Sequence, residues 1–334
     1  MTPLAPHITT FLRRHLPMER RASPHTCDTY AYAFQLLFEF AASRLKIRPS
    51  DLALEHLDSE LILAFLEYIQ DQRGNSAQTR NARLAAIKSF MTYVEHRIPG
   101  ALEQARRVLA IPIQRTDSRL VRHLTANECQ ALLAVPNPET RSGIRDRAMI
   151  YVAMTGGLRV SELVGLRMEE LTFEPRRVCI RVHGKGRKER MLLLWQTVAE
   201  ALRAWLAVRG DAAAPEVFLN ARSQPMTRGG FEYVLKKHLG AAVAQVPTLA
   251  QKRVSPHVLR HTCAMNTLQA TGDIRKVALW LGHASTQTTE VYLRADPTHK
   301  LETLGKVIPP TLRPGNFKPS DRLIAMLRGQ DYAK

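Results

Sequence analysis

The sequence predicts an α+β protein that is mostly helical and divided into two domains. Its 334 residues suffice for two domains that each bury a core. Apolar residues recur at helical spacing between residues 26 and 110, and a hairpin pattern of β-forming residues stands in the second half. We therefore expect a helical domain at residues 1–110, a linker at 111–123, a domain with a small antiparallel sheet or hairpin at 124–305, and a tail at 306–334.

The helical domain is predicted from three sets of apolar residues, each spaced to cover one face of a helix. The sets are Tyr30, Phe34, Leu37 and Phe38; Leu61, Phe65, Leu66 and Ile69; and Leu84, Ile87, Phe90, Met91 and Val94. The third segment also carries Arg80, Arg83 and Lys88. These charges could lie along a phosphate backbone, although a solvated helix face would carry them equally well. Residues 111–123 follow neither period and contain Pro112, which predicts a basic linker.

The second domain begins with a helix N-terminus, because Thr125 and Glu128 have the spacing of a capping box. A buried helix over residues 148–154 then ends at the pair Gly156-Gly157. Residues 178–182 and 190–194 predict two strands joined by a basic turn that contains glycine. Further helices are predicted over residues 198–208, 230–244, 258–269, 274–281 and 286–294.

Composition excludes several classes of protein. With 45% hydrophobic and 23% charged residues, the chain is neither a disordered tail nor a membrane protein. It has no apolar run long enough for a membrane span and no signal peptide, which predicts a cytoplasmic protein without a membrane partner. Its four cysteines lie far apart, which fits neither a disulfide framework nor a zinc finger and predicts small buried side chains.

An excess of basic residues is the first indication of function. Lys and Arg number 48 against 30 Asp and Glu, and the net charge is +18. Most of the excess lies after residue 123, and one dense group stands within residues 176–190: Arg176, Arg177, Arg181, Lys185, Arg187, Lys188 and Arg190. Such charge suits a polyphosphate partner, although an acidic surface, a lipid or simple solubility would also account for it.

Six residues of the second domain could together perform phosphoryl transfer: Arg159, Lys185, His257, Arg260, His283 and Tyr292. Guanidinium groups bind two non-bridging phosphate oxygens at once, which suits the two arginines. Tyr292 is the best nucleophile, because surrounding cations can activate a phenol whose ordinary pKa is about 10. Each residue alone also has an ordinary structural explanation.

Metal chemistry is disfavoured by the same residues. His257 and His261 have a spacing that can hold zinc, but a third ligand is lacking and Arg260 would repel the metal. The carboxylates Glu162, Glu169 and Glu170 are too isolated for a two-metal nuclease site. We therefore expect no cofactor.

The order Arg, Lys, His-x-x-Arg, Gly-His, Tyr resembles the tyrosine recombinase (phage integrase) family. Four stretches carry the resemblance, namely residues 155–163, 184–190, 255–262 and 281–292. The resemblance implies an N-terminal helical, SAM-like core-binding domain and a C-terminal catalytic domain that clamp duplex DNA. It is closest to the compact two-domain type of the family.

The resemblance also implies a role for each site residue. Tyr292 would attack the scissile phosphate to give a 3′-phosphotyrosyl link and a free 5′-hydroxyl, without metal or nucleotide. Arg159 and Arg260 would hold the non-bridging oxygens, and His283 would add a hydrogen bond. Lys185 would protonate the 5′ oxygen, with Lys188 as its nearest rival, and His257 would assist proton transfer or hold the phosphate. Glu162 would orient the site, unless it is a plain helix-terminal residue. Arg187 and Lys188 would join Arg80, Arg83 and Lys88 in gripping DNA.

The implied partners are duplex DNA with specific recombination sites and further recombinase subunits. Members of the family act as a tetramer, alone or with other recombinases, and pass a C-terminal segment to a neighbour. The apolar run 323–327 of the tail could serve in this way. The implied task is integration, excision or transposition of a mobile element. A type IB topoisomerase and a non-catalytic DNA-binding accessory protein are the alternatives.

Overall fold

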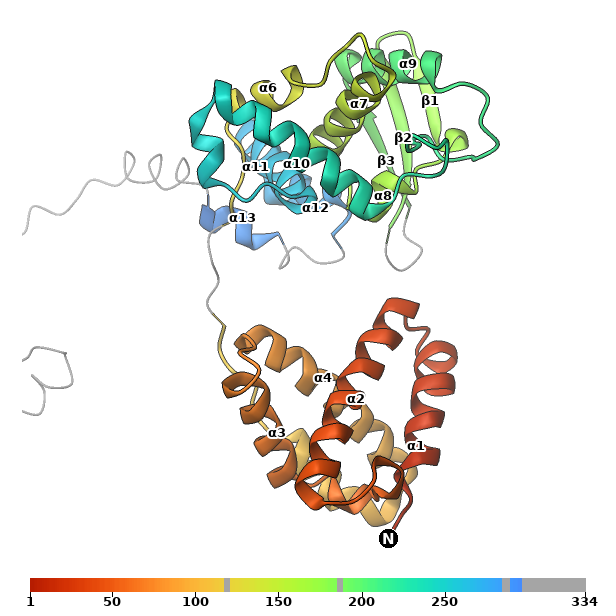
Figure 1. Cartoon of the computed structure of the whole chain (residues 1–334), viewed down its shortest axis with the longest axis vertical. Coiled ribbons are helices and arrows are strands. Elements are labelled where there is room, and N and C mark those ends of the chain that lie inside the picture. Colours follow the sequence, from red (N-terminus) through yellow and green to blue (C-terminus); the bar gives the residue numbers. More distant parts are fainter. Residues whose placement is uncertain (117–120, 185–188, 284–288, 296–334) are drawn as a thin grey trace, which may run out of the picture. The chain divides into compact units, whose positions relative to one another are not determined.

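The computed structural model describes residues 1–116, 121–184, 189–283 and 289–295. The chain divides into two compact units, Met1–Ser118 and Arg119–Lys334, shown in Figure 1. The division falls inside the segment 111–123. Ile111 is buried in the core of the first unit and Leu124 in that of the second.

The first unit is built from helices alone within its described residues, as Figure 1 shows. In chain order they are α1 (Leu4–Thr10), η1 (Phe11–Glu19), α2 (Pro24–Leu45), η2 (Pro49–Asp51), η3 (Leu54–His56), α3 (Ser59–Asp71), α4 (Ala77–Arg97), η4 (Pro99–Ala101) and α5 (Leu102–Leu109). Side-chain caps start the three long helices, because Ser23, Asp58 and Ser76 each accept a hydrogen bond from a backbone N–H of the first turn. The three predicted apolar faces are confirmed as facing the core, with Tyr30 and Phe38 of the first face only partly buried.

Helical structure begins before residue 26, where the predicted apolar faces begin. Phe11 of η1 is fully buried, and its ring meets Phe34 and Phe90 at centroid distances of 6.1 and 5.3 Å. Leu4 and Leu16 are buried in the same cluster. Residues 4–19 therefore complete the core of this unit.

The second unit combines helices with one small sheet. Its helices are α6 (Ala126–Ala134), α7 (Arg141–Gly156), α8 (Val160–Val164), η5 (Met168–Glu170), α9 (Gln196–Arg209), α10 (Arg228–Gln245), η6 (Pro247–Gln251), α11 (Pro256–Thr271), α12 (Ile274–Leu281) and α13 (Glu290–Ala295). The strands β1 (Leu171–Glu174), β2 (Arg177–His183) and β3 (Glu189–Leu194) pair antiparallel in the order β1-β2-β3. The predicted hairpin is confirmed, and β1 adds a strand too short to be recognised by alternation.

The capping box that opens the second unit is confirmed in both directions. The backbone N–H of Thr125 donates to Glu128 Oε2 at 2.8 Å, and the N–H of Glu128 donates to Thr125 Oγ1 at 3.3 Å. Lys252 also donates to Glu128 at 2.6 Å and to the carbonyl of His123 at 3.0 Å. The entry of the chain into this unit is thereby fixed to the loop that precedes α11.

Two apolar clusters support the second unit. The larger one fills the space between the sheet, α7 and α9, which pack against one another (Figure 1). The smaller one gathers α11, α12 and α13 around Met265, Leu268, Val277, Leu281 and Tyr292. The C-terminal helices are therefore anchored by their own cluster.

The four cysteines differ in their burial. Cys129 and Cys263 are buried, but Cys27 and Cys179 are only half-buried, so the prediction of four buried side chains is wrong for two of them.

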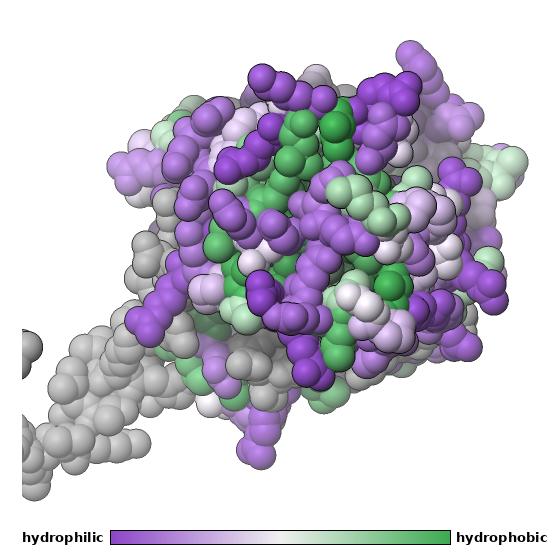
Figure 2. Space-filling view, turned by 90° about the horizontal axis from the view of Figure 1, so that it is seen from below, coloured by the Kyte–Doolittle hydropathy of each residue, from purple (hydrophilic) through white to green (hydrophobic). Residues whose placement is uncertain are grey.

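Seen from below, hydrophilic residues cover most of the visible surface, with apolar residues between them (Figure 2). Within the described ranges, no helix is both long and apolar enough to cross a membrane.

Candidate active site

Glu162 lies at the centre of a cluster of three guanidinium groups. Arg159 Nη1 donates to Glu162 Oε1 at 2.7 Å, and Arg190 Nη2 donates to Oε2 at 2.8 Å. Arg260 Nη1 lies 3.9 Å from Oε2. Burial alone would raise the pKa of Glu162, but the hydrogen bonds and charges of Arg190 and Arg159 outweigh it and lower that pKa. Three cations share one carboxylate, which leaves an excess of positive charge for an anion.

Local sequence explains the position of this carboxylate. Arg159 is the N-cap of α8 and Glu162 is its third helical residue, so the backbone N–H of Arg159 donates to Glu162 Oε2 at 2.9 Å. Glu162 is thus a helix-terminal residue of the capping box that also contacts two guanidinium groups. Its contacts support the orienting role.

Arg260 joins the ends of two helices. Helix α11 begins at Pro256, with Ser255 as its N-cap, and Arg260 is its fifth residue, with only 3% of its surface exposed. Its Nη1 donates to the carbonyl of Gly157 at the end of α7, and its Nη2 to the carbonyl of Leu281 at the end of α12, at 2.8 Å. Burial and the nearby Arg159 lower the pKa of Arg260 to about 10, so it keeps its charge at neutral pH.

His283 follows α12 directly, after Gly282 in the left-handed conformation with φ +64°. Its Nδ1 lies 2.8 Å from the hydroxyl of the buried Thr289. Burial, together with Arg260 and Arg159, lowers the pKa of His283 to about 4, so the ring is neutral at pH 7. When the Thr289 hydroxyl donates to Nδ1, the ring carries its hydrogen on Nε2 and can donate it to a phosphate oxygen.

Tyr292 is not activated in the way that we expected. Its side chain is 3% exposed within the smaller apolar cluster, and burial raises its pKa to about 12 although Arg260 opposes the change. Its hydroxyl lies 2.9 Å from Nδ1 of His261. The cations therefore do not make this phenol acidic, because the loss of hydration outweighs their effect.

The remaining predicted residues are placed as follows. His257 is exposed on the first turn of α11, and its ring meets that of His261 at a centroid distance of 4.1 Å. Lys185, Arg187 and Lys188 lie outside the described residues. Among the residues that are described, no cluster of three His, Cys, Asp or Glu side chains is arranged to hold a metal ion.

Three site residues were missed by sequence reasoning, namely Arg190, His261 and Thr289. Arg190 stands in the basic group of residues 176–190, and His261 directly follows Arg260 and was weighed only as a zinc ligand, so the sequence assigned neither of them a role at the phosphate. Arg190 meets Glu162 from a strand 28 residues away, and His261 meets Tyr292 across 31 residues. Only the fold brings these pairs together.

The basic residues of α4 do not form one open face. Arg80 is only 6% exposed, with Nη1 donating to the carbonyl of Pro112 at 3.4 Å, so the expectation of an exposed Arg80 is wrong. Lys88 is half-buried and donates to the carbonyl of Leu109 at 2.7 Å. The guanidinium of Arg83 lies 4.9 Å from the ring centre of Tyr32. Arg80 and Lys88 thus attach α4 to the segment that follows it.

Comparison with known proteins agrees with this geometry. Residues 122–299 match the phage integrase family, and residues 8–97 match the N-terminal SAM-like domain of phage integrases. The chain is 43% identical to the provisionally named integrase/recombinase y4rC of Sinorhizobium fredii, over 97% of each protein. It is 33% identical to tyrosine recombinase XerC of Pelobacter propionicus, over 94% of this chain and 99% of that protein.

Solved structures show the same fold. The XerH recombinase in a post-cleavage complex with its difH substrate matches with a TM-score of 0.67 and 21% identity, over 90% of this chain and 84% of that one. The Tn1549 transposon integrase in complex with transposon right end DNA matches with a TM-score of 0.64 and 17% identity, over 91% of this chain and all of that one. The chain therefore belongs to the phage integrase family and is a tyrosine-type site-specific recombinase.

Proposed function

We propose that this recombinase cuts and rejoins duplex DNA through a 3′-phosphotyrosyl bond at Tyr292. The observation that supports it best is the convergence of Arg159, Arg190 and Arg260 on the single carboxylate of Glu162. A scissile phosphate carries the negative charge that this cluster lacks, and fixed guanidinium groups stabilise the charge of its transition state. Tyr292 lies in the same unit, three residues after Thr289, which contacts His283.

Each residue then has a defined part. Arg159 and Arg260 hold the non-bridging oxygens, and His283 donates one hydrogen bond. Glu162 fixes the direction of the Arg159 and Arg190 guanidiniums, while the carbonyls of Gly157 and Leu281 fix that of Arg260. Lys185 supplies the proton that the departing 5′ oxygen needs, and Lys188 is its nearest alternative. A 5′-hydroxyl of a second duplex attacks the phosphotyrosine and completes the exchange, so neither a metal nor a nucleotide is consumed.

A nicked suicide duplex tests this function. With the DNA that flanks its own gene, the protein should form a covalent adduct on denaturing gels, and EDTA should not prevent it. Tyr292→Phe should form no adduct, because it lacks the attacking oxygen. An adduct with Tyr292→Phe would contradict the assignment. Strand exchange between two labelled sites supports a recombinase, whereas relaxation of supercoils alone would support a topoisomerase.

We also propose that the exchange serves a mobile element in the cytoplasm. Relatives that are 43% and 41% identical are named integrase/recombinase, although others of about 33% identity are named XerC. The two names imply different DNA sites. Excision of the DNA segment that carries the gene, measured by amplification across the rejoined ends, supports the mobile-element role, whereas recombination only at a chromosomal dimer-resolution site opposes it.

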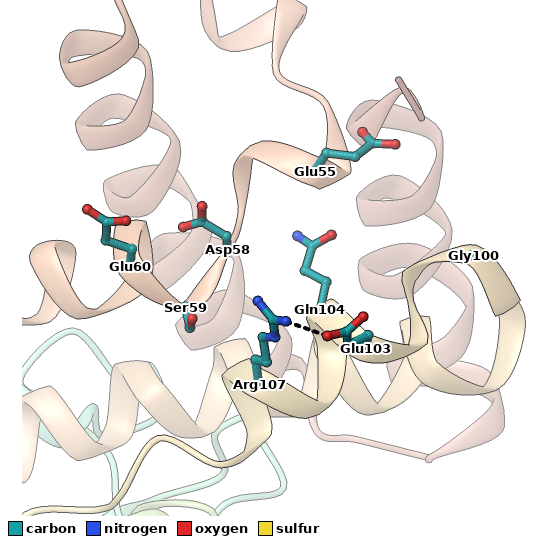
Figure 3. A pocket seen from close by; sticks show the side chains of 8 residues that line it. All are labelled: Glu55, Asp58, Ser59, Glu60, Gly100, Glu103, Gln104 and Arg107. Carbon is teal, nitrogen blue, oxygen red and sulfur yellow. Dashed lines mark hydrogen bonds and ion pairs between the residues drawn. The ribbon is translucent and has the colours of Figure 1, made fainter.

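The contact between the first unit and DNA belongs on a face away from its acidic pocket. Figure 3 shows this pocket, where Glu55, Asp58 and Glu60 lie near the start of α3 and Glu103 lies on α5. Its one arginine, Arg107, is paired with Glu103. Four carboxylates against one cation would repel phosphate. Arg83 and Lys88, whose DNA contacts are proposals, do not line this pocket.

The proposed assembly is a tetramer in which the tail of one copy docks on the next. The second unit has a pocket of about 770 Å³ with largely apolar walls, lined by Met191, Trp195, Leu279 and Trp280 among others. Leu279 is 79% exposed and Trp195 60%, which is unusual for such side chains. We assign the apolar run 323–327 of a neighbouring copy to this pocket.

Ending the chain after residue 305 tests the assembly. We expect adducts on a single duplex to persist, while exchange between two sites falls at least tenfold because the copies no longer hold together. Leu279→Glu should have the same effect. Tyr233→Glu, at a residue that is 69% exposed on α10, is the matched control and should exchange normally. Normal exchange by the shortened chain would contradict the proposal.

A further inference from the structure

The hydroxyl of Tyr292 has one hydrogen-bond partner within the described part of the chain, and that partner is His261. Nδ1 of His261 lies 2.9 Å from the hydroxyl oxygen, and the two rings meet at a centroid distance of 5.5 Å and an angle of 66°. His257 contacts the ring of His261 instead. The imidazole beside the nucleophile is therefore not that of the His-x-x-Arg motif.

His261 is held in the form that accepts a proton. Burial, then His257, Arg260, His283 and His123, lower its pKa to about 4. His257 and Arg260 belong to α11, as His261 does, while His283 follows α12 and His123 precedes α6. Tyr292 faces His261 from α13. At neutral pH the ring is uncharged, and one of its nitrogens is an acceptor.

Tyr292 needs a base that removes its phenolic proton. Its pKa of about 12 means that very little phenolate is present at neutral pH. Attack on phosphate requires the proton to leave during the step, and a neighbouring base within hydrogen-bond distance can take it. In the tautomer that carries its hydrogen on Nε2, His261 thus presents a neutral acceptor 2.9 Å from the attacking oxygen.

We propose that His261 is a catalytic residue that takes the phenolic proton of Tyr292, on the basis of the 2.9 Å contact between Nδ1 and the hydroxyl. The proposal rests on the phosphotyrosyl chemistry above. The Tyr292 O–H bond breaks and its proton passes to Nδ1, the oxygen forms a bond to phosphorus, and the bond from phosphorus to the 5′ oxygen breaks. The 5′ oxygen takes a proton from Lys185. In the reverse step the His261 imidazolium returns its proton to the phenol.

His261→Ala and His261→Asn test the proposal in single-turnover adduct formation with the suicide duplex. General base catalysis is worth about 10²–10⁴-fold, and we expect losses in that range. Asparagine can keep a hydrogen bond to the hydroxyl but cannot take the proton, so it should be as slow as alanine. An Asn variant at the wild-type rate would overturn the proposal.

A more acidic nucleophile separates proton transfer from a structural role. With a fluorinated tyrosine at position 292, whose phenol ionises near neutral pH, the His261→Ala variant should recover most of the lost rate. With ordinary tyrosine, the rate of His261→Asn depends on free phenolate, so below the pKa of the phenol it should rise about tenfold per pH unit. The rate of the wild type should change little between pH 6 and 8. Absence of recovery in a fluorinated protein that is active with His261 intact would overturn the proposal.

Two controls separate a loss of proton transfer to His261 from a role of His257 and from misfolding of the variant. His257→Ala is the matched control, and fluorination should not rescue it; rescue there and not in His261→Ala would assign the proton to His257 and overturn the proposal. Duplex binding by Tyr292→Phe with and without His261→Ala shows whether the variant folds, and we expect equal binding. A wild-type protein without any adduct would refute the proposed function instead.

Discussion

Replacing Arg260 with lysine is expected to slow adduct formation by about 10²–10³-fold, the usual effect of removing one donor to a transition-state oxyanion. Lysine keeps the charge but lacks the planar fork, so it cannot reach the carbonyls of Gly157 and Leu281 while it binds a phosphate oxygen. Binding of duplex DNA should change little, because many other cations contribute to it. The measurement is single-turnover cleavage together with duplex affinity at one salt concentration.

Arg209 provides the matched control for Arg260. It is also buried, at 7% exposure, and donates to backbone carbonyls, including that of Glu216 at 2.9 Å. Both substitutions should lower the melting temperature, because lysine cannot make the same contacts with backbone carbonyls, but Arg209→Lys should cleave at the wild-type rate. If the two variants lose the same amount of cleavage, the effect of Arg260 is one of folding and the phosphate assignment is wrong.

Gly157→Ala is expected to have the largest effect on stability, a loss of about 2–4 kcal/mol in the free energy of unfolding. Gly157 has φ +60°, and a Cβ there would lie 2.6 Å from Cδ2 of Leu281 and 3.0 Å from Sγ of Cys263. The left-handed backbone and the overpacked core both oppose alanine. Equilibrium denaturation of the whole protein measures the loss.

Gly156→Ala is the control for Gly157→Ala, because it makes the same change one residue earlier in the chain. A Cβ at Gly156 would meet its neighbours at 3.5–3.8 Å, which is ordinary contact, and Gly156 lies within the right-handed helix α7. We expect a change of less than about 1 kcal/mol, in either direction. A loss at Gly156 as large as that at Gly157 would show that the close approach to Leu281 is not the cause.

Local signals in the sequence predicted much of this fold. The capping box at Thr125, the glycine end of α7 and the two strands of the hairpin depend on residues within a few positions of one another. The strand β1 was missed because four residues carry too little alternation, so it becomes clear only when its packing partners are known. The helices before residue 20 were missed although Leu4, Ile8, Phe11 and Leu16 stand at helical spacing.

The candidate site was predictable in its residue types but not in its contacts. Arg159, Arg260, His283 and Tyr292 stand in recognisable stretches, and the described structure places all of them in one unit. Arg190 and His261 lie in two of those stretches as well, but their contacts with Glu162 and Tyr292 span long separations and could not be predicted from them. The burial that raises the pKa of Tyr292 is a property of tertiary packing, so the expectation of an activated phenol was wrong.

The short helix α12 connects assembly with chemistry. Leu279 and Trp280 line the apolar pocket, and the carbonyl of the next residue, Leu281, accepts a hydrogen bond from Arg260. His283 follows two residues after Leu281. In the proposed assembly, the segment that fills the pocket would contact the same helix whose end positions the guanidinium and the imidazole. We therefore expect an isolated copy and a copy with an occupied pocket to differ in how rigidly they hold the phosphate, which would couple cutting to the arrival of a neighbour.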